Sequence, residues 1–209
     1  MIKKALCILL SCGMIFSLSA CNSDDEKMYI EPAQLSTEEE NIGKLLGLNT
    51  DHIIYDFAVE DGVQTMEVNT YVLNDGKWDM ISGGGQKFED ITGRLALGYD
   101  KIAEGVRIAV QSDNESGATS YTTTPTIEED FSQLAIATTK LDNRTEMVFD
   151  EEIPLVLQIM TSKNEIRSHS TEQFFEPNSL EEQGHEYVYA ITVCFSQKTV
   201  SELDAERSK

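Results

Sequence analysis

Apolar and polar residues alternate with a period of two along most of the chain from residue 51 onward. The alternating stretches are Ile53–Val59, Met66–Val72, Leu95–Tyr99, Val106–Val110, Leu134–Ile136, Leu155–Ile159 and Tyr187–Phe195. Such alternation is typical of strands with one buried face, and turn residues separate the stretches at intervals of about 8–12 positions. No second long helical pattern interrupts them, which argues against a parallel βαβ sheet. We therefore predict a mainly β fold, an antiparallel β-sandwich of about 8–10 strands preceded by one short helix.

The short helix is predicted from a capping signature and the apolar positions that follow it. Ser36 or Thr37 can cap the helix, with Glu39 or Glu40 three residues on to close a capping box. Gly47 is a plausible end. The apolar residues of one helix face are Ile42, Leu45 and Leu46. Because a helix of about ten residues is marginal on its own, we expect this face to dock on the rest of the domain.

One hairpin can be assigned in register from residues 73–77. A two-residue type I′ turn at Asp75-Gly76 pairs Leu73 with Trp78, whereas a three-residue loop with left-handed Gly76 pairs Val72 with Trp78. The second choice places one apolar set on a single face: Met66, Val68, Val72, Trp78 and Met80. Because a one-residue slip turns every side chain of a strand to the other face, we predict the three-residue loop.

Two further features interrupt the strand pattern. Gly83-Gly84-Gly85 follows the Trp78 strand but lacks the Lys-Ser/Thr and the helix of a phosphate-binding loop. We interpret it as a bulge or a flexible crossing, with close approach of a ligand left open. Pro154 removes a ladder donor, so we place it at the start of a strand, after the acidic loop Asp150–Glu152.

The first residues have the layout of a secretory signal peptide. Lys3 and Lys4 precede an uncharged, mostly apolar stretch over 5–20, shorter than the roughly 20 residues that span a hydrocarbon core. The stretch ends Leu18-Ser19-Ala20-Cys21, which resembles the lipobox of bacterial lipoproteins. The resemblance implies cleavage between Ala20 and Cys21 and acyl chains, such as palmitate, on Cys21. Beyond the lipobox, the domain resembles the small, functionally unassigned lipoproteins of Gram-positive bacteria.

These observations divide the chain into four parts. Residues 1–20 are expected to be a lipoprotein signal peptide and 21–37 a lipidated acidic tether. Residues 38–200 are expected to form a single β-rich domain with an N-terminal helix, and 201–209 a polar tail that frays or forms a weak helix. The implied location is the cell membrane, with the domain anchored by lipid and facing outside the cytoplasm.

The charge and the cysteine content of the chain exclude some binding partners and argue against a disulfide. The chain has 37 Asp and Glu against 16 Lys and Arg, a formal net charge of -21. Phosphate backbones are bound by basic side chains, so nucleic acid is an unsuitable partner, and anionic headgroups should repel the domain. Cys7 and Cys12 leave with the signal peptide and Cys21 takes lipid, so we expect no disulfide. Cys194 lies in an apolar run and is expected to be a small buried residue.

Candidate metal and catalytic residues form no recognised motif. His52, His169 and His185 lie in polar positions with no metal-ligand spacing, and we expect them to be exposed at strand ends. We therefore predict no catalytic or cofactor residue. Calcium is left possible, because it takes carboxylate and carbonyl oxygens and the chain has acidic clusters at 113–117, 128–130 and 150–152. The best candidates for exposed aromatic rings are Tyr121, Phe174 and Phe175.

The function favoured by these observations is a non-catalytic binding or interaction module held at the membrane through Cys21. Its ligand would be a protein, a wall polymer or a small molecule. An extracytoplasmic hydrolase and a calcium-dependent binding domain remain the alternatives. A solute-binding component of a transporter is disfavoured, since such proteins have two α/β lobes.

Overall fold

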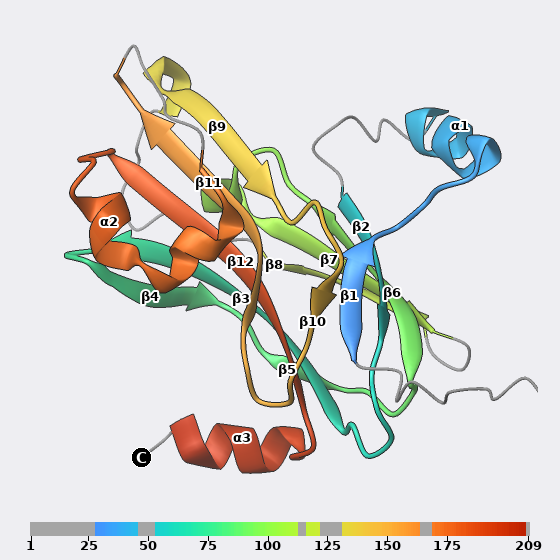
Figure 1. Ribbon diagram of the computed structural model, residues 1–209. Helices are drawn as coiled ribbons and strands as arrows, with labels where there is room; N and C mark the ends of the chain where they lie inside the picture. Colours follow the sequence, from blue (N-terminus) through green and yellow to red (C-terminus); the bar gives the residue numbers. More distant parts are fainter. Residues whose placement is uncertain (1–27, 46–52, 113–115, 122–130, 164–168, 208–209) are drawn as a thin grey trace, which may run out of the picture.

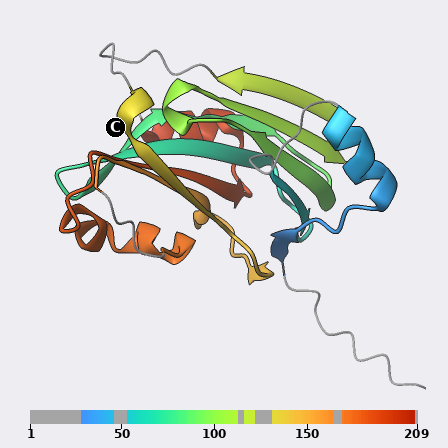
Figure 2. The same cartoon turned by 90° about the horizontal axis from the view of Figure 1, so that it is seen from above.

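Two antiparallel sheets packed face to face form the domain in a computed structural model, which describes residues 28–45, 53–112, 116–121, 131–163 and 169–207 (Figures 1 and 2). Sheet A has the order β10-β1-β2-β6-β7-β8, and sheet B has the order β4-β3-β12-β11-β9 with β5 paired to β3. Sheet A comprises β1 (Tyr29–Pro32), β2 (Ile53–Ala58), β6 (Thr92–Gly98), β7 (Val106–Ser112), β8 (Ser116–Tyr121) and β10 (Thr145–Glu146). Sheet B comprises β3 (Thr65–Asn74), β4 (Lys77–Ser82), β5 (Gly85–Lys87), β9 (Ala135–Lys140), β11 (Ile153–Thr161) and β12 (Tyr187–Ser196). The predicted fold class is confirmed.

Short helices lie between successive strands along the chain and after the last strand. The α-helices are α1 (Thr37–Leu45), α2 (Pro177–Glu181) and α3 (Val200–Arg207). The 3₁₀ helices are η1 (Ile102–Glu104), η2 (Phe131–Gln133) and η3 (Thr171–Phe175). Within the described ranges, every helix is too short or too polar to span a membrane.

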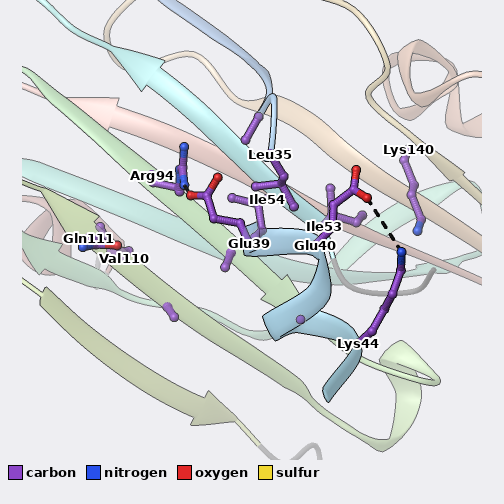
Figure 3. Close-up of a pocket in the computed structure, with 14 residues that line it drawn as sticks. Leu35, Glu39, Glu40, Lys44, Ile53, Ile54, Arg94, Val110, Gln111 and Lys140 are labelled. Atoms are coloured by element: carbon purple, nitrogen blue, oxygen red, sulfur yellow. Dashed lines mark hydrogen bonds and ion pairs between the residues drawn. The ribbon is translucent and has the colours of Figure 1, made fainter. Parts of the chain in front are cut away.

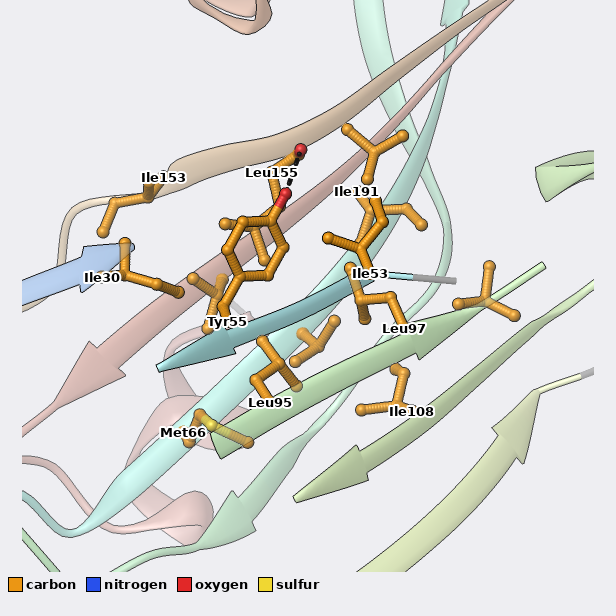
Figure 4. Close-up of a cluster of buried hydrophobic side chains, with 14 of the residues drawn as sticks. Ile30, Ile53, Tyr55, Met66, Leu95, Leu97, Ile108, Ile153, Leu155 and Ile191 are labelled. Carbon is orange, nitrogen blue, oxygen red and sulfur yellow. Dashed lines mark hydrogen bonds between the residues drawn. The ribbon is translucent and has the colours of Figure 1, made fainter. Parts of the chain in front are cut away.

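The main core fills the space between the two sheets (Figure 4). Tyr55 on β2 is fully buried, and its hydroxyl donates a hydrogen bond to the Leu155 carbonyl on β11 at 3.1 Å. This bond links the two sheets and gives the buried phenol a partner, as a buried polar group requires. Around it pack Ile30, Leu95, Leu97 and Ile191, all with essentially no exposed surface.

The two sheets differ in how far the side chains on their outer faces are buried. Along β2, buried and partly exposed residues alternate strictly, as expected for strands with one covered face. Along β11 every residue is buried. A second cluster covers the outer face of sheet B, where η3 contacts β11 and α2 contacts β3 and β4. Its members are Tyr71, Leu73, Leu157, Ile159, Phe174, Leu180, Val188 and Ala190.

This second cluster corrects the predicted alternation of Leu155, Leu157 and Ile159. Leu155 faces the main core, whereas Leu157 and Ile159 belong to the outer cluster. The register shifts between Pro154 and Val156, so a bulge separates the two sets. Pro154 lies near the strand's start, as predicted.

The predicted hairpin loop is wrong. Leu73 pairs with Trp78, and both turn residues have positive φ, 48° at Asp75 and 70° at Gly76, as in a two-residue type I′ turn. The prediction assumed that only one face of the hairpin is buried. On the outer face, Trp78 stacks on Phe174 at 5.1 Å between ring centroids and donates Nε1–H to the Phe174 carbonyl at 2.8 Å.

Gly83-Gly84-Gly85 is a place of close backbone approach rather than a bulge. The bulge lies just before it, because Met80 pairs with Tyr71 while Ser82 pairs with Thr70. Gly85 then pairs with Glu67 in the same register as Ser82. A Cβ on Gly83 would lie 3.2 Å from Cα of Asn69, and a Cβ on Gly85 would lie 2.8 Å from Cγ2 of Thr65, so a larger residue would force the neighbouring strand to shift.

The N-terminal boundary of the predicted domain needs correction, whereas the C-terminal tail has the second of its two expected forms, a weak helix. The tether predicted over 21–37 contains a strand, because β1 pairs with β2 and β10, and Ile30 of β1 and the preceding Met28 are buried in the main core. The tail predicted over 201–209 contains most of α3. That helix buries no residue, and Arg207 at its end forms an ion pair with Glu67 of β3 at 2.6 Å.

Candidate functional site

A pocket of about 820 Å³ lies between α1 and the outer face of sheet A (Figure 3). This volume is within the roughly 300–1,000 Å³ that pockets for small molecules occupy. From α1 and the segment before it, the lining residues are Ala33, Leu35, Glu39, Glu40, Gly43 and Lys44. From the strands they are Ile53, Ile54, Arg94, Ala96, Ala109, Val110, Gln111 and Lys140.

Small residues on facing surfaces produce the hollow. Ile54, Ala96 and Ala109 are aligned across β2, β6 and β7 and share the outer face of sheet A. Opposite them, α1 presents Gly43, which has no side chain. Because Ala96, Ala109 and Gly43 carry a small side chain or none, the space between helix and sheet stays unfilled beside Ile54.

Helix α1 does not dock through its apolar face, contrary to our expectation. None of its residues is buried, and Ile42 and Leu45 are 54% and 87% exposed. A polar bridge positions the helix instead. Arg94 on β6 donates to Glu39 of α1 and to Asp56 of β2, each at 2.8 Å.

The predicted capping box is confirmed at the start of α1. Glu39 accepts hydrogen bonds from the Ser36 backbone N–H at 2.7 Å and from the Ser36 hydroxyl at 2.8 Å. The Ser36 hydroxyl in turn accepts from the Glu39 N–H at 3.3 Å. These bonds, together with Arg94, lower the pKa of Glu39 to about 2. Glu39 thus both caps the helix and ties it to the sheet.

The charge at the pocket differs from that of the chain as a whole. Three cations line it, Arg94, Lys44 and Lys140, and the carboxylates beside them are Glu39 and Glu40 in the lining and Asp56 bound to Arg94. In the whole chain, acids outnumber bases by more than two to one. Lys44 lies 3.7 Å from Glu40 and its side chain is 70% exposed, so this pair is weak. With Asp56, which also binds Arg94, the acidic and basic side chains at the pocket are balanced, unlike those of the chain as a whole.

A polar cluster lies on the outer face of sheet B, formed by residues of β3, of β12 and of the loop before β11. Glu152 Oε1 accepts hydrogen bonds from the Tyr71 hydroxyl, from Asn69 Nδ2 at 3.2 Å and from Thr192 Oγ1 at 3.0 Å. Beside it, Glu67 is buried, and burial raises its pKa in spite of Arg207. We call Glu67, Asn69, Tyr71, Glu152 and Thr192 the carboxylate cluster. Glu152 joins three of its side chains, whereas Glu67 Oε1 and Asn69 Oδ1 are buried without a hydrogen-bond partner.

The structure places the histidines differently from our expectation. His169 and His185 are partly buried, and their rings meet edge to face with centroids 5.8 Å apart. Burial first, and then the charges of His169 and Lys163, lower the pKa of His185. Over the part of the chain that the structure describes, no three His, Cys, Asp or Glu side chains gather as a metal would need. His52 lies outside the described residues.

The remaining candidates are distributed as follows. Cys194 is buried as predicted, and burial raises the pKa of its thiol to about 12. Phe175 is 62% exposed, whereas Phe174 is buried in the second cluster. Of the acidic clusters, 150–152 is anchored by the bonds to Glu152 and by a bond from Ser196 to Asp150. Outside the described residues lie Ala20, Cys21, residues 113–115 and 128–130, and the side chain of Tyr121.

The pocket itself was missed from the sequence. Its only signal is that Ile54, Ala96 and Ala109 are apolar or small at positions that alternate with the buried ones. No family model, curated protein or solved structure shows significant similarity to the chain.

Proposed function

We propose that the chain is a lipid-anchored extracytoplasmic protein whose β-sandwich is a non-catalytic binding module, with the pocket under α1 as its binding site. One observation carries the proposal: a helix with no buried residue stands over an apolar sheet face and leaves about 820 Å³ between them. An apolar cavity bordered by a few charged groups is the common form of a small-molecule site.

The charged groups of the pocket support a role in binding. Arg94 is held by Glu39 and Asp56, so its guanidinium fixes the helix over the sheet. The hydrogen bonds that cap α1 hold Glu39 in the same network. The walls of the pocket are thus positioned before any ligand arrives, which reduces the entropy lost on binding.

The anchor part of the proposal rests on the lipobox that ends at Cys21. The first described strand begins at Tyr29, so few residues separate the modified cysteine from the sandwich. Seven residues span at most about 25 Å when fully extended. Lipidation of Cys21 would therefore keep β1, and the pocket beside the segment that follows β1, close to the membrane surface.

The binding site is tested by filling the pocket. All described contacts lie within 28–207, so the chain from residue 22 onward contains the complete domain. We expect the neutral dye Nile red to bind this protein saturably, and Ala96→Trp or Ala109→Trp to abolish the binding. Ala58→Trp is the matched control, because Ala58 is a partly exposed alanine of sheet A that does not line the pocket.

Two results would overturn this assignment. One is the absence of saturable Nile red binding to the unmodified domain. The other is equal binding by the Ala96→Trp protein and the Ala58→Trp control. The anchor is tested separately in cells with Cys21→Ser, which should release the protein or leave it unprocessed. Correct processing and membrane retention of that variant would contradict lipid attachment at Cys21.

A further inference from the structure

We infer that the pocket under α1 binds uncharged molecules with an apolar body, and that Gly43 of α1 sets the space such a molecule can fill. This inference rests on the proposed function and specifies its ligand. It follows from three features of the pocket: an apolar floor, a balance of charge along its walls and a glycine in the helix that covers it.

The floor accepts the apolar body of the ligand. Ile54, Ala96 and Ala109 form a row without a polar side chain, and most of the surface exposed in the pocket is apolar. The row crosses from β2 through β6 to β7, so its length is about 10 Å, twice the spacing of paired strands. Removing apolar surface from water favours binding in proportion to the area covered. The affinity is therefore expected to come from the apolar part of the ligand.

Each cationic side chain that lines the described pocket already has a partner. The guanidinium of Arg94 binds two carboxylates, each at 2.8 Å. Lys44 pairs with Glu40 at 3.7 Å (Figure 3), and Lys140 is also engaged in an interaction. A charged ligand would lose hydration in the pocket without gaining an unpaired counter-charge, and burying an unpaired charge is costly. An uncharged ligand avoids that cost.

Gly43 lies in α1 where the helix covers the alanine floor. A glycine within a helix weakens it relative to alanine, because glycine loses more conformational freedom on folding. At this position the missing side chain leaves room for a ligand to contact the helix backbone on one side and the alanines on the other. A larger residue at position 43 would occupy that room. Gly43 is therefore expected to determine which ligands fit.

The charge preference is tested with three ligands of equal chain length, octanol, octanoate and octylammonium, at neutral pH and below their micellar concentrations. Each competes with Nile red for the domain from residue 22 onward. We expect octanol to displace the dye at about one tenth of the concentration that either ion needs, because the ions give up more hydration. The two ions should differ from each other by less than about threefold, since the charges at the pocket are balanced.

Glu40→Gln is designed to break this balance. It removes the carboxylate beside Lys44 and leaves one positive charge in excess at the pocket. The ratio of octanoate affinity to octanol affinity should then rise about threefold, the effect of one exposed charge. Glu38→Gln is the matched control, because Glu38 is an exposed acid of α1 that does not line the pocket. It should leave the ratio unchanged.

The role of Gly43 is tested with Gly43→Leu, which places a side chain between α1 and the floor. We expect this variant to lose the binding of both Nile red and octanol. Leucine forms helices more readily than glycine, so the melting temperature should not fall, and the loss of binding is then not a loss of fold. Asn41→Leu is the matched control, since Asn41 is an exposed residue of α1 that does not line the pocket. It should bind both molecules as the unmodified domain does.

Several results would overturn the inference while leaving the pocket's role as a binding site intact. They are displacement of Nile red by either ion at the same or a lower concentration than octanol, failure of octanol to displace the dye, and unchanged octanol binding by Gly43→Leu. Size-exclusion chromatography adds another: a dimer disrupted by Ala96→Trp but not by Ala58→Trp would identify a second copy of the chain as the occupant. Failure of Nile red to bind at all removes the proposed function instead, so the two failures are distinguishable.

Discussion

The helices that cover the outer faces of the two sheets pack very differently against them. On sheet B, η3 and α2 insert Phe174 and Leu180 against the strands, and Leu180 has no exposed surface. On sheet A, α1 lies over the strands without burying any residue. The same arrangement of a short helix on a sheet therefore gives a packed secondary core on one side and a pocket on the other.

The size of the outward side chains explains the difference. Sheet B presents Tyr71, Leu73 and Ile159, which reach the helices that cover them. Sheet A presents Ala96 and Ala109 beneath Gly43 of α1. Protein interiors are close-packed wherever side chains can meet. A hollow of this kind persists only where the backbone is held apart by other contacts, here the bridge from Glu39 through Arg94 to Asp56.

The largest effect is expected when the same Leu→Ala substitution is made in α2, on sheet B, and in α1, on sheet A. Leu180→Ala removes a fully buried side chain from the sheet B cluster and should cost about 2–5 kcal/mol in the free energy of unfolding. Leu45→Ala removes a side chain of α1 that is 87% exposed and should change it by less than about 0.5 kcal/mol. Urea denaturation of both variants measures the two values. Similar losses would show that α1 packs on sheet A in solution and closes the pocket.

The same contrast explains which parts of the fold were predictable from the sequence. Ile53, Tyr55 and Phe57 alternate because sheet A buries one face, and a period of two reports this directly. The outer set of sheet B was not predictable, because Leu73 and Leu157 are covered by η3 and α2, short helices that do not belong to the alternating pattern of the strands. A short apolar run is consistent with burial on one face or on both.

The candidate site was harder to predict than the fold. The capping box from Ser36 to Glu39 is local and was identified in advance. The pocket depends on where α1 lies relative to sheet A, and that is decided by Arg94, far away in the sequence. The alternation of apolar and polar residues is a local pattern, so it cannot reveal that Arg94 pairs with Glu39. The carboxylate cluster likewise joins residues of β3, β12 and the loop before β11.

A second test concerns α3, which also lacks buried residues but is tied to a buried charge. Arg207→Ala leaves the carboxylate of Glu67 without its ion-pair partner, and should cost about 1–3 kcal/mol at neutral pH. Burial already raises the pKa of Glu67, so the folded state takes up its proton more readily than the unfolded state. The destabilisation should therefore be largest at neutral pH and shrink on acidification through that raised pKa.

Urea unfolding at neutral and acidic pH measures the effect of Arg207→Ala. Adding Glu67→Gln to the variant should remove its pH dependence, because no carboxylate then remains to be neutralised. Lys198→Ala is the control on the same part of the chain, since its ion pair with Glu206 is exposed. If Arg207→Ala and Lys198→Ala behave alike, α3 is held no more firmly than an exposed ion pair would hold it.

The smallest expected effect concerns the polar bridge that holds α1 over the pocket. Glu39→Gln removes the charge that binds Arg94 and weakens the capping box, so α1 should exchange its amide hydrogens severalfold faster. Global stability should hardly change, because α1 buries no side chain.

The pKa of Glu39 lies at about 2, below its ordinary 4.5. The stabilisation of α1 by the ionised carboxylate of Glu39 is therefore complete above pH 4.5 and lost as the pH falls through 2. Amide NMR shifts of α1 should follow that titration in the unmodified domain and in Glu38→Gln, the neighbouring control, while those of α2 stay constant. Movement of α1 and α2 together would mean that the two outer faces are not independent.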